Sequence, residues 1–232
     1  MSDSLHRHYD CNYCTFRTLS CKAVTSEEFE LVRRSSQQLI FRKGETLLKQ
    51  GAKASSLVYL HKGIVKFNYE NEAGKNIILT IISGPILLGG ANLFFKEVNL
   101  FSLIAMEECQ ACLIDSMAMK RLLMNNGKYS VMMFEESTEM FRSAIFNFIS
   151  LTNKQVNGRI ADILIYLSTH VYHSNKFTLA FTKKEISEFA ACSHENVITT
   201  LSRMNKEGFI KLEGKTLEIT DVSRLKEISR YW

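Results

Sequence analysis

Proline and cysteine are both scarce in this chain, with 1 and 6 residues respectively among 232. So little proline excludes a proline-rich linker and allows long uninterrupted helices. So few cysteines exclude a small fold stapled by disulfides, and a hydrophobic content of 46% supports an ordinary buried core. The formal net charge of +5 permits nucleic-acid binding without requiring it. The length favours two domains.

The chain also shows no export signal, because its start is polar and lacks a compact apolar stretch. One uncharged run, Ile77 to Phe95, is long enough to suggest a membrane span. Ser83-Gly84-Pro85 and Gly89-Gly90 interrupt this run, and its first part is β-branched, which favours two buried strands joined by a turn. We therefore predict a cytoplasmic protein with no membrane partner, whose thiols are kept reduced.

Residues 39–115 have the pattern of short antiparallel strands. Apolar or alternating runs such as SLVYLHKGIVKF are separated by glycines, and NEAGKN between two of the runs is typical of a hairpin turn. Strands this short and this evenly spaced predict a small antiparallel barrel or roll.

A helical period follows, because from about Tyr129 to Leu151 apolar residues recur every three or four positions without Gly or Pro. They form two adjacent stripes. The first is Phe134, Phe141, Ile145 and Phe148, and the second is Met133, Met140, Ala144 and Leu151. A helix that is apolar on two faces requires two partners. We expect the first stripe to contact the same helix of a second subunit and the other to cover the roll, the alternative being burial within a single large domain.

The last third of the chain contains the pattern of two helices joined by a tight turn. Thr182-Lys183-Lys184-Glu185 matches a capping box and predicts a short helix from about Lys183 to Phe189. The small pair Ala191-Cys192 suits the turn, and Ser193 can cap a second helix that Gly208 ends.

The second of these helices has an apolar face and a polar face. Val197, Leu201 and Met204 share one side, whereas Glu195 and Thr199 lie opposite, as a helix that reads the major groove requires. FIKL and TLEI then indicate a β-hairpin wing with lysines available for phosphates. A helical hairpin with a solvated face is the alternative. The predicted DNA contacts are Thr182, Lys183, Ser193, His194, Glu195, Asn196, Thr199, Arg203, Lys211 and Lys215.

Three motifs taken in order, KGETLLKQGAKASSLVYLHKGIVKF, SLTNKQVNGRIADILIYL and FTKKEISEFAACSHENVITTLSRMNKEGFI, resemble the Crp/Fnr family of bacterial transcription regulators. The resemblance implies an α+β fold with a jelly-roll-like antiparallel β-roll of the cyclic-nucleotide-binding type, a long dimerisation helix and a winged helix-turn-helix. It implies a cysteine-containing segment at 1–24, a sensor roll at 25–124, the dimerisation helix at 125–156 and a DNA-binding domain at 157–232. It further implies a homodimeric, non-enzymatic regulator whose partners are double-stranded DNA and RNA polymerase.

Two departures from the family pattern change what we expect. The cyclic-AMP branch carries Gly-Glu and Arg-Ser in its effector pocket, where this sequence has Gly89-Gly90 and Asn99-Leu100. A pocket without these charges cannot make the charge-assisted bonds that a cyclic phosphate needs, so cyclic AMP is not expected as the effector and another ligand stays open. Thr199 stands where family members often have an Arg suited to guanine, so the family's familiar operator is not expected.

Half of the cysteines crowd into one short segment, as Cys11, Cys14 and Cys21. Clustered thiolates suit soft metal ions and iron–sulfur clusters, but three are one short of a closed site. The oxygen-sensing branch of the family has a similar trio and a fourth ligand at the end of the roll, which the resemblance places at Cys112. Cys109 is a rival, although residues three apart on a strand point to opposite faces.

Three outcomes remain open for this cysteine site. The first is the absence of any metal. The second is zinc bound by the trio together with His6, His8 or Cys112. The third is an oxygen- or redox-sensitive iron–sulfur cluster on Cys11, Cys14, Cys21 and Cys112.

Two other function classes also remain. One is a thiol oxidoreductase using Cys11 and Cys14, which the position of these residues ahead of a β-roll disfavours. The other is a ligand-binding regulatory protein without DNA binding, which the wing and the capped helix disfavour. Cys192, in the turn between the two helices, is expected to be a small packing residue.

Overall fold

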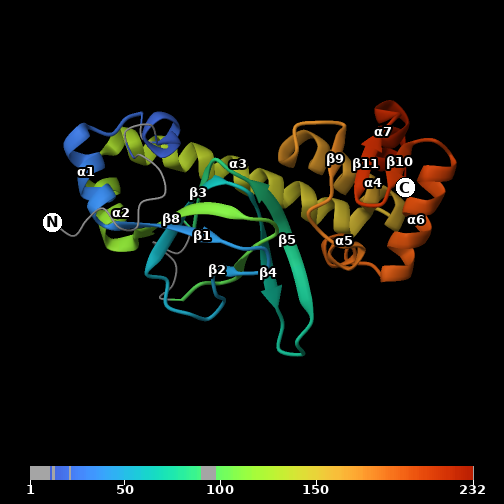
Figure 1. Cartoon of the computed structure of the whole chain (residues 1–232), viewed down its shortest axis with the longest axis horizontal. Helices are drawn as coiled ribbons and strands as arrows, with labels where there is room; N and C mark the ends of the chain where they lie inside the picture. Colours follow the sequence, from blue (N-terminus) through green and yellow to red (C-terminus); the bar gives the residue numbers. More distant parts are fainter. Residues whose placement is uncertain (1–10, 12–13, 21, 90–97, 232) are drawn as a thin grey trace. The chain divides into compact units, whose positions relative to one another are not determined.

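The computed structural model covers the whole chain and describes residues 11, 14–20, 22–89 and 98–231 (Figure 1). The chain divides into two compact units, Met1–Val65 with Ser83–Phe141 and Lys66–Ile82 with Arg142–Trp232. The first unit holds most of the strands, and the second holds the helix-turn-helix together with a β-hairpin.

The β-rich region forms two four-stranded sheets, with strand orders β1-β8-β3-β6 and β2-β7-β4-β5. β1, β3, β6 and β8 pair antiparallel, as do β2 and β7, which confirms the predicted antiparallel roll. The strands are β1 (Ser36–Phe41), β2 (Thr46–Leu48), β3 (Ser56–Lys62), β4 (Ile64–Glu70), β5 (Asn76–Ser83), β6 (Ile86–Leu88), β7 (Ser102–Ala105) and β8 (Cys109–Asp115).

The uncharged run at 77–95 contains β5 and β6, as the strand interpretation predicted, with residues 90–97 outside the described part. Among the described residues, no helix combines the length and the apolar character needed to cross a membrane.

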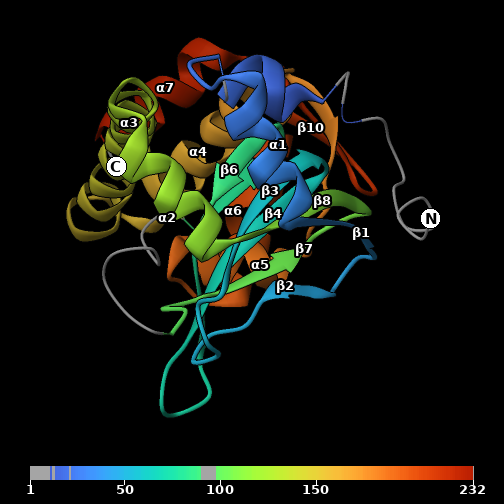
Figure 2. The same cartoon turned by 90° about the vertical axis from the view of Figure 1, so that its left-hand side faces the viewer.

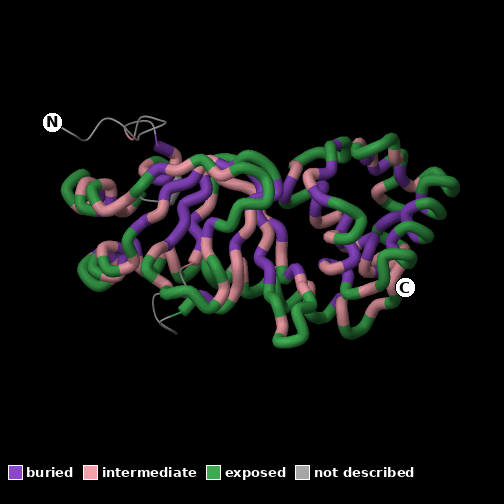
Figure 3. Tube along the Cα trace, turned by 60° about the horizontal axis from the view of Figure 1, so that its bottom comes forward, coloured by how far each residue is buried: buried purple, intermediate pink, exposed green. Residues whose placement is uncertain are grey.

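The sheet β1-β8-β3-β6 supports the core of the first unit. Helices α1 (Ser26–Arg34) and α2 (Ser116–Asn125) contact β8 and each other (Figure 2). Buried positions are concentrated on the strands, whereas the loops are largely exposed (Figure 3). Phe29 of α1, Tyr59 of β3 and Met119 of α2 belong to one buried cluster.

The amino-terminal segment is part of this core. Cys14 and Phe16 are 6% and 4% exposed and belong to the same buried cluster. The Phe16 ring, at the start of a short π-helix (η2, Phe16–Ser20), lies 4.8 Å from the ring of Tyr59. Packing of these aromatic rings therefore holds the segment against β3.

The long predicted helix is α3 (Gly127–Asn153), slightly longer at both ends than the periodic stretch from Tyr129 to Leu151. Asn126 precedes it, and its Oδ1 accepts a hydrogen bond from the Tyr129 amide at 2.9 Å. This bond satisfies one of the amide donors that a helix start leaves without a partner.

The second unit builds a three-stranded sheet, ordered β10-β11-β9, beside a group of helices. α4 contacts α5, α6 and α7, so it forms the centre of the unit. The elements are α4 (Val156–Tyr166), a π-helical turn η4 (Leu167–Val171), β9 (Lys176–Thr178), α5 (Lys183–Ala190), α6 (His194–Lys206), β10 (Ile210–Glu213), β11 (Thr216–Ile219) and α7 (Val222–Tyr231).

Candidate DNA-binding interface and cysteine site

The amino end of α5 is closed by the predicted capping box. The Thr182 hydroxyl accepts from the Glu185 amide at 3.2 Å, and the Glu185 carboxylate accepts from the Thr182 amide at 2.8 Å. Burial would raise the pKa of Glu185, but hydrogen bonds from Lys66 and Thr182 outweigh it and hold this pKa below its ordinary value. Glu185 is therefore ionised near neutral pH, and its negative charge interacts favourably with the positive, amino-terminal end of the helix dipole.

The turn between α5 and α6 requires a left-handed backbone at Ala191, with φ 47° and ψ 51°. The Cys192 amide donates a hydrogen bond to the Ser187 carbonyl at 3.1 Å, and the Arg159 guanidinium donates to the Ala191 carbonyl at 3.3 Å. The Ser193 hydroxyl accepts from the Asn196 amide at 3.2 Å and starts α6 as predicted. These bonds fix the angle between the two helices.

α6 buries one face and exposes the other. Val197, Leu201 and Met204 are at most 1% exposed. Thr200 is buried too, and its hydroxyl donates to Oδ1 of Asn157 on α4 at 2.9 Å, an anchor that sequence reasoning missed. The predicted DNA contacts are all exposed, namely Thr182, Lys183, Ser193, His194, Glu195, Asn196, Thr199, Arg203, Lys211 and Lys215.

The wing is the predicted hairpin of β10 and β11, turned at Gly214 with φ 61°. Asn205 at the end of α6 accepts from the Leu212 amide at 2.8 Å and ties the helix to the wing. Lys211 pairs with Glu213 at 3.0 Å, and this hydrogen bond raises the pKa of Lys211. A phosphate would therefore compete with Glu213 for this exposed ammonium.

The pKa of Glu195, the first acidic residue of α6, lies below its ordinary value. Its carboxylate accepts from its own amide and from the Ser193 hydroxyl, which favours the charged form. An ionised carboxylate accepts hydrogen bonds only, which suits the amino group of cytosine in the major groove.

In the first unit, an imidazole lies between two of the predicted metal-binding cysteines. His61 of β3 has Nδ1 4.0 Å from the Cys14 sulfur and Nε2 3.3 Å from the Cys112 sulfur. The Tyr59 hydroxyl donates to Thr15 Oγ1 at 3.1 Å, and that oxygen lies 3.4 Å from His61 Nδ1. The amino-terminal segment thus contacts Nδ1 of the ring, and Cys112 of β8 contacts Nε2.

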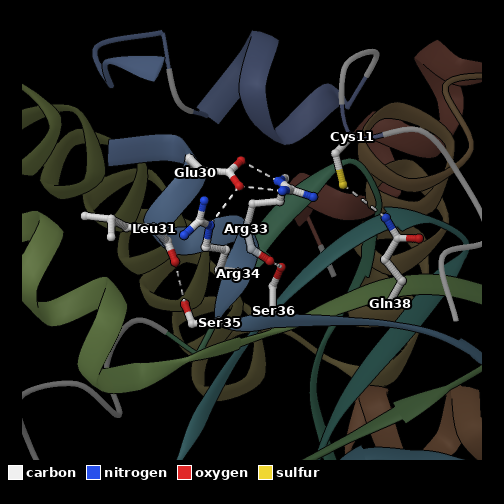
Figure 4. A network of polar contacts seen from close by, with 8 residues as sticks. All are labelled: Cys11, Glu30, Leu31, Arg33, Arg34, Ser35, Ser36 and Gln38. Carbon is white, nitrogen blue, oxygen red and sulfur yellow. Dashed lines mark hydrogen bonds and ion pairs between the residues drawn. The ribbon is translucent and has the colours of Figure 1, made fainter. Parts of the chain in front are cut away.

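Cys11 reaches the same part of the roll through β1. The Gln38 amide donates to the Cys11 sulfur at 3.3 Å (Figure 4), and Gln38 pairs with Cys112 across β1 and β8. On α1, Glu30 binds the guanidinium groups of Arg33 and Arg34 (Figure 4). We refer to Cys11, Cys14, His61 and Cys112 together as the cysteine site.

Burial governs the protonation of this site. It lowers the pKa of His61 from 6.5 to about 4 and raises the pKa of the Cys14 thiol. His61 is therefore a neutral imidazole at neutral pH. The raised pKa of Cys14 is the opposite of what a thiol nucleophile requires, which disfavours the oxidoreductase alternative.

Cys109 points away from this site, as the alternation of a strand predicted. It is fully buried, and its sulfur contacts the carbonyls of Ile64 and Glu107 at 3.4 Å. Burial raises the pKa of Cys109 to about 11. A β-carbon added at Gly63, whose φ is +108°, would lie 2.6 Å from the Cys109 sulfur.

The donors of the cysteine site suit a soft metal in chemistry but do not converge. Three described thiols reach this part of the roll, yet the His61 ring lies between Cys14 and Cys112. Among the described residues, no group of three His, Cys, Asp or Glu side chains is placed to hold a metal ion. The predicted ligand Cys21 and the alternatives His6 and His8 lie outside the described residues.

Two family models match the chain. A cyclic nucleotide-binding domain matches residues 38–126, and a Crp-like helix-turn-helix domain matches residues 158–228. The chain belongs to the Crp/Fnr family of transcription regulators. It is thus a Crp-like DNA-binding regulator with a roll of the cyclic-nucleotide-binding type.

Known proteins of this family resemble the chain over most of its length. The cAMP-activated global transcriptional regulator CRP of Pasteurella multocida is 28% identical over 179 residues, 75% of this chain and 85% of that protein. FixK2 from Bradyrhizobium japonicum shares the fold with a TM-score of 0.76 at 15% identity, over 83% of this chain and 96% of that chain. A protein described as a Crp/Fnr regulator from Eubacterium rectale shares the fold with a TM-score of 0.74 at 15% identity. The match covers 94% of this chain and 99% of that chain.

The positions predicted to line an effector pocket in this Crp/Fnr protein are partly described. The Asn99 side chain is buried and donates to the Lys49 carbonyl at 3.1 Å, and its amide donates to the Ala52 carbonyl at 2.8 Å. Asn99 thus holds the loop that follows β2. Leu100 is exposed, Gly89 has φ +90°, and Gly90 lies outside the described residues.

Along α3 of the Crp/Fnr chain, the stripe predicted for dimerisation is exposed. The exposed fractions are 74% for Phe134, 66% for Phe141, 42% for Ile145 and 66% for Phe148. Large apolar side chains exposed in a row on one helix are typical of an interaction surface.

Proposed function

We propose that the protein is a homodimeric, sequence-specific transcription regulator whose DNA affinity is controlled by an event at its amino-terminal roll. The observation that carries the proposal is the polar face of α6, which stays exposed while the opposite face anchors the helix in the core. Helices built in this way read base edges in the major groove while the flanking residues bind phosphates.

DNA binding is tested by fluorescence anisotropy with genomic fragments of the source organism. The affinity should fall steeply with salt, because each phosphate contact releases counterions. A fragment selected from this pool should bind more tightly than its scrambled version. Equal affinity for both sequences would contradict specific recognition.

The homodimer is supported by the exposed stripe Phe134, Phe141, Ile145 and Phe148 on α3. Burying these side chains against the same helix of a second copy would remove a large apolar surface from water. Sedimentation of Phe141→Glu should give a monomer, and Glu135→Gln, a change at another exposed position of the same helix, should remain a dimer. A monomeric wild type would overturn this part of the proposal.

The signal is proposed to act at the cysteine site, through an iron–sulfur cluster on Cys11, Cys14, Cys21 and Cys112, with zinc or no metal as the alternatives. The support is that three of these thiols reach one part of the roll. Cysteine thiolates hold such clusters, whose chemistry supplies oxygen or redox sensitivity. The His61 ring must leave its place between Cys14 and Cys112 before these two thiols can converge.

Iron, sulfide and zinc analysis after anaerobic purification tests the metal. Cys112→Ser should lose the metal, whereas Cys192→Ser should keep it. A colourless, metal-free protein with the same DNA affinity in air and under nitrogen would contradict the sensor proposal.

The remaining parts of the proposal concern the effector, the partners and the chemistry. Cyclic AMP is not the effector, because Asn99 and Leu100 lack the charge that binds a cyclic phosphate; calorimetric titration with cyclic AMP should show no heat of binding. RNA polymerase is the proposed protein partner, and the cytoplasm is the compartment. No enzymatic activity is proposed, and insulin-disulfide reduction lost in Cys11→Ser would contradict this.

A further inference from the structure

The β4–β5 hairpin makes polar contacts with helices of its own compact unit that the DNA-binding function does not by itself explain. Residues 66–82 of this hairpin belong to the unit that contains α4, α5 and α6. Lys66 binds Glu185 of α5 at 2.8 Å, and the Ile81 carbonyl accepts from the Tyr166 hydroxyl of α4 at 2.8 Å. Asn147 of α3 donates to the Leu79 carbonyl at 3.2 Å. The hairpin therefore contacts three helices.

The Lys66–Glu185 ion pair is largely shielded from solvent, with side-chain exposures of 13% and 20%. One Glu185 oxygen binds the Lys66 ammonium, and the other accepts from the Thr182 amide. A single carboxylate thus joins the hairpin to the capping box of α5. Because the pair is shielded, salt screens it less than a surface pair.

Tyr166 provides a second connection at the same place. Its hydroxyl also lies 3.2 Å from the Thr80 hydroxyl, and its ring meets the Phe189 ring of α5 edge-on with centroids 6.2 Å apart. The hairpin, α4 and α5 therefore converge around one side chain. Two contacts, one ionic and one through Tyr166, restrain α5 from the hairpin side.

We propose that Lys66 is a positioning residue of the DNA-binding surface, which fixes the amino end of α5 through Glu185 and thereby the pose of α6. The inference rests on the proposed DNA contacts of Thr182, which is the cap of this box, and of Lys183, which follows it at the start of α5. Lys66 itself need not touch DNA. Its role is to hold the Glu185 carboxylate, which in turn orders the proposed DNA contacts Thr182 and Lys183.

A positioning role for the ion pair and a purely electrostatic effect on DNA predict opposite changes in DNA affinity for one variant. If only net charge near DNA mattered, Glu185→Gln would remove a negative charge and strengthen binding. If the ion pair positions α5, Glu185→Gln weakens binding although the amide can still accept from the Thr182 backbone. Lys66→Met weakens binding under both views, so the Glu185 variant decides.

The experiment is a double-mutant cycle with Lys66→Met, Glu185→Gln and the double variant. Affinities are measured by fluorescence anisotropy for a duplex that carries a selected site and for a scrambled duplex. The controls are Lys66→Arg, which keeps the charge, and Lys75→Met, which removes an exposed lysine from the same hairpin. Circular dichroism of every variant reports folding.

We expect each single variant to bind the selected site about tenfold more weakly, which corresponds to about 1.4 kcal/mol. The double variant should be no weaker than either single variant, because the two residues act as one unit. Binding to the scrambled duplex should change less, since misplaced helices lose base contacts more than phosphate contacts. Lys66→Arg and Lys75→Met should stay within about twofold of the wild type.

Three results would overturn the positioning role. They are tighter binding by Glu185→Gln, additive losses in the double variant, or a salt slope lowered by about one in Lys66→Met, which would indicate a direct phosphate contact. A wild type that binds neither duplex would instead contradict the proposed function, and the inference with it. If Lys66→Met does not fold, Glu185→Gln and Lys66→Arg carry the test.

Discussion

Thr199 and Thr200 are neighbours on α6, one exposed and one buried. The same substitution at each position tests which face of this helix is buried and which is exposed. Thr200 is 4% exposed and donates to Asn157 at 2.9 Å, whereas Thr199 is exposed. Valine has nearly the volume of threonine and lacks the hydroxyl, so Thr→Val removes the hydrogen bond without opening a cavity.

In Thr200→Val the Asn157 oxygen loses its donor inside the unit, at a cost of about 1 to 2 kcal/mol. For a unit of this size, the melting temperature should fall by about 3 to 8 °C. Thr199→Val should change the free energy of unfolding by less than about 0.5 kcal/mol, because the site is exposed. It should instead alter the sequence preference at one base pair, since Thr199 lies on the predicted reading face.

The assay is thermal unfolding followed by circular dichroism, with DNA selection carried out on the same three proteins. Both variants introduce valine into one helix, so the difference in helix propensity cancels between them. If Thr199→Val were the destabilised variant and Thr200→Val changed the sequence preference, α6 would be rotated by about one residue, or 100°. That outcome would refute the assigned reading face.

Further predictions concern backbone conformation and pH. Ala191→Gly should raise the free energy of unfolding by about 0.5 to 1 kcal/mol in a thermal melt, because glycine adopts the left-handed turn without strain; a loss of stability would contradict this. Gly63→Ala should destabilise the roll by about 2 to 4 kcal/mol in a denaturant titration, because its β-carbon would meet Cys109; a neutral effect would show that the strand can shift. Burial lowers the pKa of His61 below its unfolded value, so protonation of this ring favours the unfolded state. The contribution of the neutral ring to the free energy of unfolding is therefore fully present above pH 6.5 and is lost as the pH falls toward about 4. After allowing for partial exposure, the free energy of unfolding should fall between these pH values by about 2 kcal/mol more in the wild type than in His61→Gln, measured by denaturation at each pH. Parallel plots of this free energy against pH for the two proteins would contradict a buried neutral ring.

The local features of the fold were predictable from the sequence, because caps and turns depend on neighbouring residues. The capping box of Thr182 and Glu185, the Ser193 cap and the end of α6 at Gly208 all lie within one or two helical turns of chain. The stripe on α3 was visible for the same reason, since its spacing repeats within the helix.

The contacts that the sequence concealed join residues far apart along the chain. His61 meets Cys14 and Cys112 across 47 and 51 residues, and no local pattern marks a single histidine in a strand as their partner. Lys66 and Glu185 are 119 residues apart. Only the packing of the hairpin with α5 brings that pair together.

The burial of the amino-terminal segment was also hidden. Its composition is polar around the cysteines, yet Cys14 and Phe16 enter the core beside Tyr59. Two apolar side chains in a polar stretch give no periodic signal, although they suffice to hold the segment against the roll. The cysteine site therefore belongs to the folded first unit.

Whether α6 reads the DNA sequence while the wing holds the backbone is decided by the affinities of Glu195→Ala and Lys211→Ala for a selected site and for its scrambled version. Glu195→Ala should lose about 1 to 3 kcal/mol on the selected site and little on the scrambled duplex. Lys211→Ala should weaken both duplexes alike and lower the salt slope by about one. Equal losses on both duplexes for Glu195→Ala would show that α6 does not read the base sequence through this carboxylate.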